Sequence, residues 1–193
     1  MKKIKQIVTI FATLALAVTA GLSFAGTKTK AAGSDEFTRT AIEIAADMGY
    51  GWNLGNTMEA TNTWTSNPKV TDFETAWGQP VTTKAMIDGI KKAGFNSIRI
   101  PVSWSNMMSS DGNYTIDASY FKRVDEIISY AFANDMYVII NDHYDGGWWE
   151  HFCGNKRDCM KHYKSMWTQV AEHYKDYSEK LIFESANEEL GDS

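Results

Sequence analysis

The strongest constraint in this sequence is the regular alternation of strand-like and helix-like hydrophobic runs. The strand-like runs occupy residues 51–54, 97–102, 137–140 and 181–183. Helix-like runs, with apolar residues three and four positions apart, precede the first strand and separate the others. Their expected positions are residues 37–48, the stretch from Thr82 or Thr83 to Gly94, the stretch from Asp117 to Asn134, and residues 158–174. This alternation predicts an α/β fold of parallel strands joined by right-handed crossovers, either an open sheet or part of a barrel.

The segments that follow the strands favour the barrel. They are long, and they carry most of the Trp, His, Asn and Asp side chains. In barrels the chemistry is built from the loops at the carboxyl ends of the strands. A complete (β/α)8 TIM barrel takes about 250 residues. We therefore expect a partial barrel of about the first four βα units, over residues 37–193.

The amino-terminal residues have the features of a secretory signal. Residues 1–5 include three lysines, residues 7–18 form a short apolar run, and Ser23-Phe24-Ala25 resembles a cleavage site. The apolar run is too short to span a bilayer comfortably. We expect a signal peptide at residues 1–25, a flexible lead-in at 26–36, and a secreted protein.

Charge excludes several classes of partner. Without residues 1–25 the chain has 16 basic and 24 acidic side chains. Nucleic acids and anionic membranes both need basic surface, so neither is expected as a partner. Five residues of one loop raise the question of a metal site: Asp142, His143, Asp145, His151 and Cys153. They lack a recognised ligand spacing, so we expect no metal and no cofactor.

The last predicted strand ends in a group of polar residues that suits acid–base chemistry. Asn187 and Glu188 follow the apolar residues 181–183. A carboxyl at the rim of a hydrophobic strand suits a general acid, and the preceding amide suits a sugar hydroxyl. The alternative is that Glu188 and Glu189 are solvated loop acids. Glu184 is too far from Glu188 to be its catalytic partner. The two lie about 13 Å apart along an extended strand, whereas retaining glycosidases hold their carboxyls about 5–5.5 Å apart.

Two further polar residues accompany the second and third strands. Arg99 lies between isoleucines, and a buried arginine needs carboxylate partners such as Glu184 or a catalytic nucleophile. Otherwise it would extend to solvent from an edge strand. His143 follows the third strand, where it could bind sugar hydroxyls or steer a carboxylate, or serve only a structural role.

Aromatic residues are concentrated in the predicted loops. The tryptophans concerned are Trp52, Trp64, Trp77, Trp104, Trp148 and Trp149. Flat rings of this kind stack on the apolar faces of sugars, but some of them also serve in ordinary core packing. Cys153 and Cys159 lie close together in the sequence and suit either a small disulfide loop or two thiols.

Four segments together resemble glycoside hydrolase family 5, the cellulase-type retaining enzymes. These segments are Gly51-Trp52-Asn53-Leu54-Gly55-Asn56-Thr57, Gly94-Phe95-Asn96-Ser97-Ile98-Arg99-Ile100-Pro101-Val102, Val138-Ile139-Ile140-Asn141-Asp142-His143 and Ile182-Phe183-Glu184-Ser185-Ala186-Asn187-Glu188. Each ends a predicted strand, and they occur in the family's order. The resemblance implies a (β/α)8 barrel and an endo-β-1,4-glucanase that hydrolyses a β-glucan polysaccharide with net retention.

The resemblance also implies roles for single residues. Glu188 would be the acid/base, and Asn187 would contact the sugar 2-hydroxyl. Arg99 would hold the nucleophile and tune its charge, and His143 would line the catalytic subsite. Substrate contacts are further expected from Asn53, Tyr144, Trp148 and Trp149.

Three departures from the family pattern accompany the resemblance. Tyr144 stands where many members have a second histidine, which leaves the preferred β-glycan open. Glu189 stands where proline often follows the catalytic glutamate. The family's nucleophile ends the seventh strand, but this chain stops just beyond the fourth. We therefore expect the amino-terminal half of a catalytic domain, with open sheet edges and little activity by itself.

Other functions are also compatible with parts of this pattern. The same mechanism could act on xyloglucan, mixed-linkage glucan, mannan or xylan. A non-catalytic carbohydrate-binding half-barrel would use the loop tryptophans without cleaving the polymer. A flavodoxin-like open sheet would need a phosphate-binding loop after its first strand, and Gly55-Asn56-Thr57 lacks that pattern.

Overall fold

The computed structural model describes residues 39–188, so the predicted signal peptide at 1–25, the lead-in at 26–36 and Glu189 lie outside the described residues. The helices are α2 (Ala41–Met48), α3 (Val70–Glu74), α4 (Lys84–Lys92), α5 (Ala118–Phe132) and α6 (Lys156–Tyr174). The strands are β1 (Gly51–Asn53), β2 (Ser97–Ile100), β3 (Tyr137–Asn141) and β4 (Leu181–Glu184). Two short 3-10 helices, η1 (Trp104–Met107) and η2 (Asp145–His151), follow β2 and β3.

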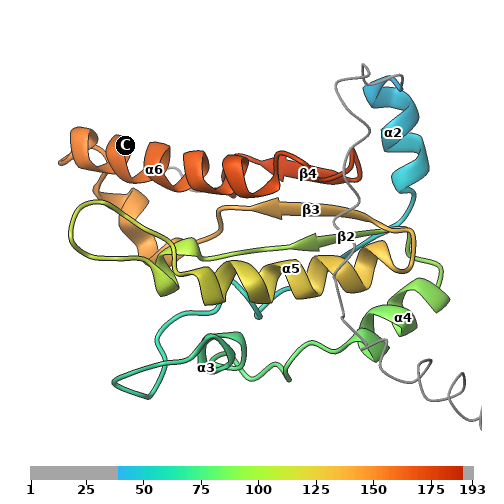
Figure 1. Ribbon diagram of the computed structural model, residues 1–193, viewed down its shortest axis with the longest axis horizontal. Coiled ribbons are helices and arrows are strands. Elements are labelled where there is room, and N and C mark those ends of the chain that lie inside the picture. Colours follow the sequence, from blue (N-terminus) through green and yellow to red (C-terminus); the bar gives the residue numbers. More distant parts are fainter. Residues whose placement is uncertain (1–38, 189–193) are drawn as a thin grey trace, which may run out of the picture.

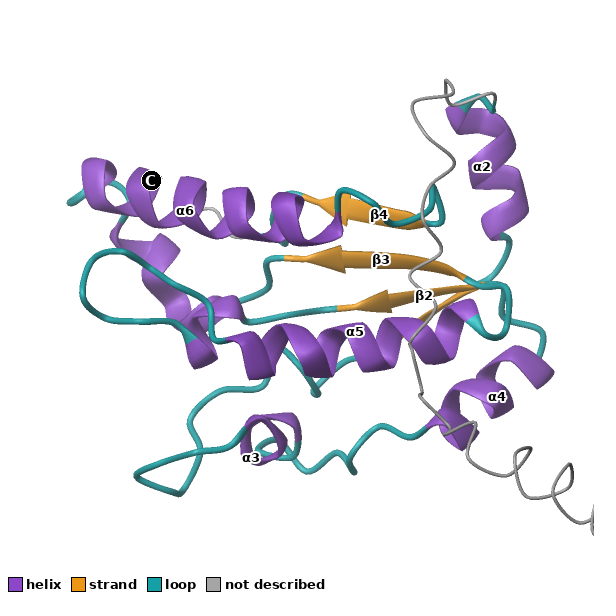
Figure 2. Ribbon diagram, in the orientation of Figure 1, coloured by secondary structure: helices purple, strands orange, loops and turns teal. Residues whose placement is uncertain are grey.

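The four strands form one parallel sheet in the order β1-β2-β3-β4, which confirms the predicted topology. Each strand pairs with the next one along the chain, as in a barrel wall. Helices α5 and α6 run along the strands, and α4 lies next to α5, below the amino-terminal end of β2 in the view shown (Figures 1 and 2). The carboxyl ends of all four strands therefore lie on the same edge of the sheet.

The two faces of the sheet differ in chemistry. Alternate strand residues, among them Ile98, Ile100 and Ile140, are fully buried in one hydrophobic core with the inner faces of α5 and α6. The register aligns Arg99 with Ile139, and Asn141 with Glu184, so the polar side chains share the opposite face. This polar face is the one that a barrel turns toward its interior.

Helix boundaries follow local capping. The Thr40 side chain and Glu43 form a capping box, so α2 begins at Ala41 rather than at residue 37. Thr83 and Asp117 cap α4 and α5, as predicted. Gly94 has a φ of 98°, which a residue with a side chain rarely adopts, and it ends the α4 segment.

Other boundaries differ from those expected. Strand β2 ends at Ile100 rather than at residue 102, because Pro101 has no N–H to continue the ladder. Helix α6 begins two residues before the expected Asp158. Helix α3 lies in a segment predicted as loop, since five residues are too few to show a helical period.

Both outer strands have an open side. Within residues 39–188, β1 pairs only with β2, and β4 only with β3. Trp52 on β1 and Phe183 on β4 are each 45% exposed, which is high for large apolar side chains.

No helix in this part of the chain is long and apolar enough to cross a membrane.

A buried ion pair joins the connection after β1 to α5. The Glu74 carboxylate is fully buried and receives two hydrogen bonds from Arg123, Nε to Oε2 at 2.9 Å and Nη2 to Oε1 at 2.8 Å. The backbone N–H of Thr82 also donates to Glu74 Oε1, at 2.7 Å. Because the carboxylate has donors on both oxygens, the pair is well satisfied, but its removal leaves a buried charge.

We predict that Glu74→Gln lowers the free energy of unfolding by about 3 kcal/mol, because Arg123 keeps its charge and loses its buried counter-ion, retaining only the half-exposed Glu126. Urea unfolding measures the change. Glu172→Gln removes an exposed pair with Lys175 and should cost less than about 1 kcal/mol. Equal losses in the two variants would contradict the role given to the buried pair.

Candidate active site

Arg99 is the centre of the polar face. Its Nε donates to Glu184 Oε2 at 2.6 Å, and its Nη2 donates to Glu184 Oε1 at 2.8 Å. This two-point pairing reaches from β2 to β4 and confirms the predicted carboxylate partner. The alternative, an arginine extending from an edge strand, is wrong because β2 lies between β1 and β3.

The same guanidinium also contacts three residues that sequence analysis assigned to the site. Nη1 donates to Asn53 Oδ1 at 2.9 Å, and Nη2 donates to Asn187 Oδ1 at 2.9 Å. His143 Nδ1 lies 3.5 Å from Nη2. One side chain thus gathers residues from the ends of β1, β3 and β4, because parallel strands present their carboxyl ends together.

The pairing sets the protonation of its carboxylate. Hydrogen bonds from Arg99 lower the pKa of Glu184 below its ordinary value, and they outweigh the opposing effect of burial. The same contact raises the pKa of the Arg99 guanidinium. Glu184 is therefore held as an anion, which suits an orienting or structural group better than a proton donor.

Asn141 is a member of this network that sequence reasoning did not single out. It is fully buried, and its Nδ2 donates to Glu184 Oε1 at 3.3 Å. Its Oδ1 accepts from the backbone N–H of Val102, at 3.3 Å. In the sequence, Asn141 is recognisable only as a polar residue directly after the apolar run of β3. The sheet register is what shows that its side chain faces Glu184.

Asn187 and Glu188 lie in the turn after β4. The backbone N–H of Asn187 donates to the carbonyl of Asp142 at 2.8 Å, which fixes the turn against the end of β3. Glu188 is exposed. The low-dielectric surroundings expected beside Glu188 are thus not provided by the described residues. Its assignment as acid/base stays a prediction.

The loop after β3 turns sharply at Tyr144. The Asp145 N–H donates to the His143 carbonyl at 2.6 Å across Tyr144, whose φ is 55° and ψ is −54°. This is a γ-turn, a strained conformation for a residue with a side chain. The Tyr144 ring is exposed, with its centroid 6.2 Å from that of Trp77. Tyr144 and Trp77 are thus neighbours, and both rings are partly exposed to solvent.

The Trp148–Trp149 pair, one of the candidates for stacking on sugars, packs against other rings of the protein. The two rings stack on each other with centroids 4.0 Å apart, and Trp148 also stacks on His162 at 4.2 Å. Both indoles are half-buried. Their binding of sugar stays a prediction.

Trp104 does not belong with the loop tryptophans considered as sugar platforms. It is fully buried, its Nε1 donates to the carbonyl of Asn141 at 2.9 Å, and its ring packs against Phe121. The position of Trp104 in a predicted loop does not reveal that its side chain is buried in the core.

Cys159 is buried as a thiol, and its Sγ donates to the carbonyl of Trp148 at 3.6 Å.

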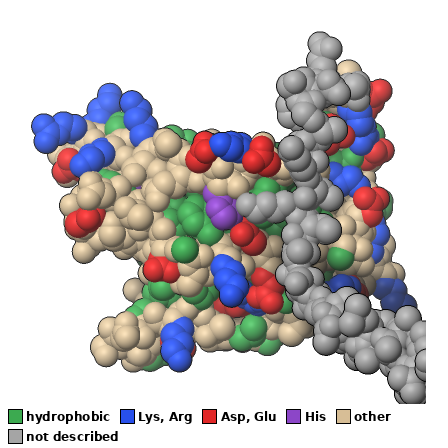
Figure 3. Space-filling view, viewed as in Figure 1, with side chains coloured by type: hydrophobic (Ala, Val, Ile, Leu, Met, Phe, Trp, Pro, Cys, Tyr) green, Lys and Arg blue, Asp and Glu red, His purple; other side chains and the backbone are tan. Residues whose placement is uncertain are grey.

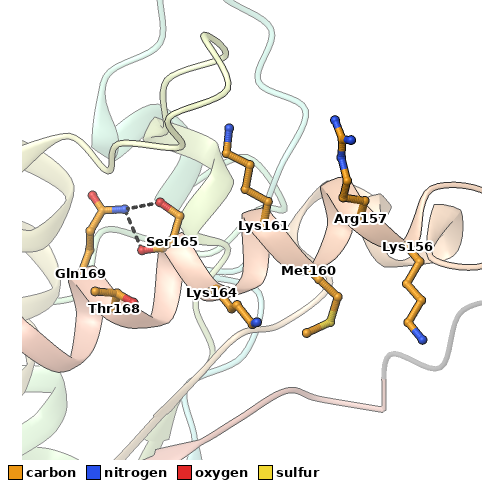
Figure 4. Close-up of a pocket in the computed structure, with 8 residues that line it drawn as sticks. All are labelled: Lys156, Arg157, Met160, Lys161, Lys164, Ser165, Thr168 and Gln169. Carbon is orange, nitrogen blue, oxygen red and sulfur yellow. Dashed lines mark hydrogen bonds between the residues drawn. The ribbon is translucent and has the colours of Figure 1, made fainter.

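The surface of the described residues includes a hollow on α6 and another beside β1. One lies along α6 and contains no residue of the Arg99 network (Figure 4). Basic side chains gather over the same helix (Figure 3). The other lies beside β1 and includes Asn53, Trp52 and Phe95. Among residues 39–188, no group of three or more His, Cys, Asp or Glu side chains is placed to hold a metal ion.

Comparison with known families identifies the source of this arrangement. A family model described as cellulase (glycosyl hydrolase family 5) matches residues 58–193. The chain belongs to this family. Family membership agrees with the resemblance of the four strand-end segments, all of which supply residues to the Arg99 network.

Individual relatives of this family 5 chain support the partial barrel. Endoglucanase A of Paenibacillus barcinonensis is 44% identical over 91% of this chain and 44% of the relative. A broad-specificity endoglucanase from Ruminococcus champanellensis, solved with cellotriose, is 43% identical with a TM-score of 0.72, over 77% of this chain and 43% of that chain. A lichenase from Caldicellulosiruptor sp. F32 is 45% identical with a TM-score of 0.71, over 78% and 40%. The chain spans less than half the length of these relatives.

We predict that Arg99→Met raises the pKa of Glu184, because the carboxylate loses its main stabilising donor. In the unsubstituted chain, the pairing stabilises the fold above the ordinary Glu pKa of 4.5, and this contribution is lost as the pH falls through the lowered value. In the variant this pH dependence should be lost. Carbon-13 NMR titration of the Glu184 carboxyl measures the pKa directly.

Lys84→Met is the matched control, since it removes an exposed cation from Asp88 on α4. It should leave the Glu184 titration unchanged. An unchanged Glu184 pKa in Arg99→Met would contradict the assignment of the guanidinium as the controlling donor.

Proposed function

We propose that this chain belongs to a secreted, retaining endo-β-1,4-glucanase and supplies the acid/base half of its active site. The observation that carries the proposal is the Arg99 network. It holds Asn53, His143 and Asn187 within reach of one guanidinium, next to Glu188. Polar hydrogen-bonding groups beside an exposed carboxyl suit the binding of sugar hydroxyls and proton transfer to a glycosidic oxygen.

Each residue has a stated role in the proposed reaction. Glu188 protonates the leaving-group oxygen and then, as carboxylate, activates the water that releases the product. Asn187 is held by Arg99 and orients the sugar 2-hydroxyl. His143 lines the subsite in which the scissile sugar lies, with Tyr144 at its rim.

The nucleophile is proposed to come from outside the described residues. Glu184 is committed to Arg99 and lies four residues along the chain from Glu188, a span of about 13 Å in extended backbone. A retaining mechanism needs a second carboxyl about 5–5.5 Å from the acid/base. Relatives more than twice as long as the matched segment are consistent with a further carboxyl on a later strand. By itself, the 193-residue chain should then show little or no turnover.

The proposed polymer is a β-1,4-glucan, and mixed-linkage glucan is the second candidate. Solved relatives include a broad-specificity endoglucanase and a lichenase, and Tyr144 is a departure at the rim that could alter preference. The net charge of −5 supports a neutral polysaccharide rather than nucleic acid or an anionic membrane as partner. The signal-peptide pattern of residues 1–25, with its lysines, short apolar run and cleavage-site-like residues, supports secretion.

The mechanism is tested in a chimaera in which residues 39–188 replace the matching half of the Ruminococcus champanellensis enzyme. We predict that Glu188→Gln lowers kcat/KM on carboxymethylcellulose by at least about 100-fold, since general acid catalysis contributes roughly 10²–10⁴. An aryl cellobioside with a good leaving group should keep more of its cleavage rate, because its departure needs less protonation. Reducing-sugar and chromogenic assays measure the two rates.

Glu150→Gln provides the control, because Glu150 is an exposed carboxyl in the loop after β3 and has no proposed role. It should leave both rates nearly unchanged. Equal losses on polymer and aryl substrate in Glu188→Gln would count against the acid/base role.

A further inference from the structure

A second carboxylate lies behind the rim, outside the Arg99 network. Asp145 is only 1% exposed, yet it has an ionisable side chain in the loop after β3. Three donors converge on it. Ser105 donates its backbone N–H to Oδ1 at 2.6 Å and its hydroxyl to Oδ2 at 2.7 Å, and Trp148 Nε1 donates to Oδ2 at 2.6 Å. A buried acid with this many donors holds its neighbours in fixed positions.

The backbone of Asp145 ties the same two loops together. Its N–H donates to the His143 carbonyl at 2.6 Å and to Ser103 Oγ at 3.2 Å. Ser103 Oγ lies 2.8 Å from both the His143 and the Glu59 carbonyl oxygens, and its single proton is shared between these two acceptors. The loops after β1, β2 and β3 therefore meet at this point, directly beneath His143 and Tyr144.

The cluster of Ser105, His162 and Asp145 resembles a nucleophilic triad only in composition. His162 Nε2 lies 3.0 Å from Ser105 Oγ, but the carboxylate binds the serine rather than the imidazole. Because the serine proton is already donated to Asp145, His162 donates to Ser105 instead of accepting from it. Burial lowers the pKa of His162 to about 4, so the ring is neutral at neutral pH. The arrangement does not activate a nucleophile.

The charge state of Asp145 is set by competing effects. Burial raises its pKa, and hydrogen bonds from Ser105, Trp148 and the Asp142 carboxyl oppose that rise. Trp149, stacked on Trp148, donates from Nε1 to Asp142 Oδ2 at 2.8 Å. Each of the two stacked indoles is thus held through its N–H by one of two neighbouring carboxyl groups.

We propose that Asp145 is a positioning residue for substrate binding. It fixes the γ-turn that places His143 and Tyr144 at the rim, and it holds the stacked pair Trp148–Trp149 behind them. Its action on substrate rests on the proposed glucanase function, but its effect on the tryptophan stack does not. A misplacement of about 1 Å in such a site costs up to about 100-fold in rate.

The first experiment uses the 193-residue chain and needs no activity. Two stacked indoles give an exciton couplet in circular dichroism, which depends on their mutual geometry. In Asp145→Asn one of the two oxygens becomes an NH₂ group, which donates and cannot accept, so it faces either the Ser105 backbone N–H or both the Ser105 hydroxyl and Trp148 Nε1. The couplet should therefore fall to less than about half, with the helical signal and cooperative unfolding retained.

Asp111→Asn is the matched control. Asp111 also accepts from a serine hydroxyl and a backbone N–H, but in an exposed loop. Its variant should keep the couplet. If Asp145→Asn fails to fold, Ser105→Ala removes a single donor and should reduce the couplet in part. A couplet unchanged in whichever of these two variants folds, or absent from the unsubstituted chain, would overturn the proposal.

The second experiment uses the chimaera described above and separates binding from chemistry. Asp145→Asn should raise KM for cello-oligosaccharides by about tenfold or more, with a smaller change in kcat, because the misplaced rim residues contact substrate without transferring protons. A merely structural role would lower the active fraction and hence kcat, with KM unchanged, and that result would overturn the proposal. Failure of the unsubstituted chimaera to cleave any glucan would instead refute the proposed function and leave the couplet result standing.

Discussion

The arrangement of the strand ends depends on one requirement, that a guanidinium on the inner face of a sheet must be neutralised. Arg99 lies on β2 among apolar residues, and an unpaired charge there would be costly. Glu184 supplies the counter-ion from β4, two strands away, and Asn141 on the intervening strand donates to the same carboxylate. The remaining donors of Arg99 then hold Asn53 and Asn187. One charge pair thus organises the ends of all four strands.

The scaffold that presents this network is asymmetric in burial. One face of the sheet is sealed by α5 and α6 over a continuous core, whereas both outer strands have an open side within residues 39–188. The buried Glu74–Arg123 pair attaches the segment after β1 to helix α5. Trp52 on β1 and Phe183 on β4 are large apolar side chains that the described residues leave 45% exposed.

Much of the fold could be predicted from sequence because its signals are local. Capping by Thr83 and Asp117, the stop at Pro101 and the apolar period of α5 are all written in short segments. The sequence also predicts that Arg99 has a carboxylate partner, with Glu184 as one candidate, because a buried arginine requires an acid.

The rest depends on three-dimensional placement. Asn141 acquires its role from strand register, Trp104 from its depth in the core, and Asp145 from a γ-turn that no residue pattern announces. The exposure of Glu188 likewise depends on which elements surround the turn after β4. Side chains whose partners lie in other loops, such as Asp145 and Trp148, are therefore not predictable from a residue pattern, whereas Arg99 is, because a charge between apolar residues requires a partner.

The central claim, that Glu188 is the acid/base at the rim of this half-site, is tested most directly by the stereochemistry of azide rescue. In the chimaera, Glu188→Ala would form the glycosyl-enzyme from an activated aryl cellobioside but lack the base that activates water. Azide needs no base, so it should restore turnover and yield the β-glycosyl azide, identifiable by proton NMR. An α-glycosyl azide would instead make Glu188 the nucleophile, and absence of rescue with cleavage unaffected would remove it from the reaction.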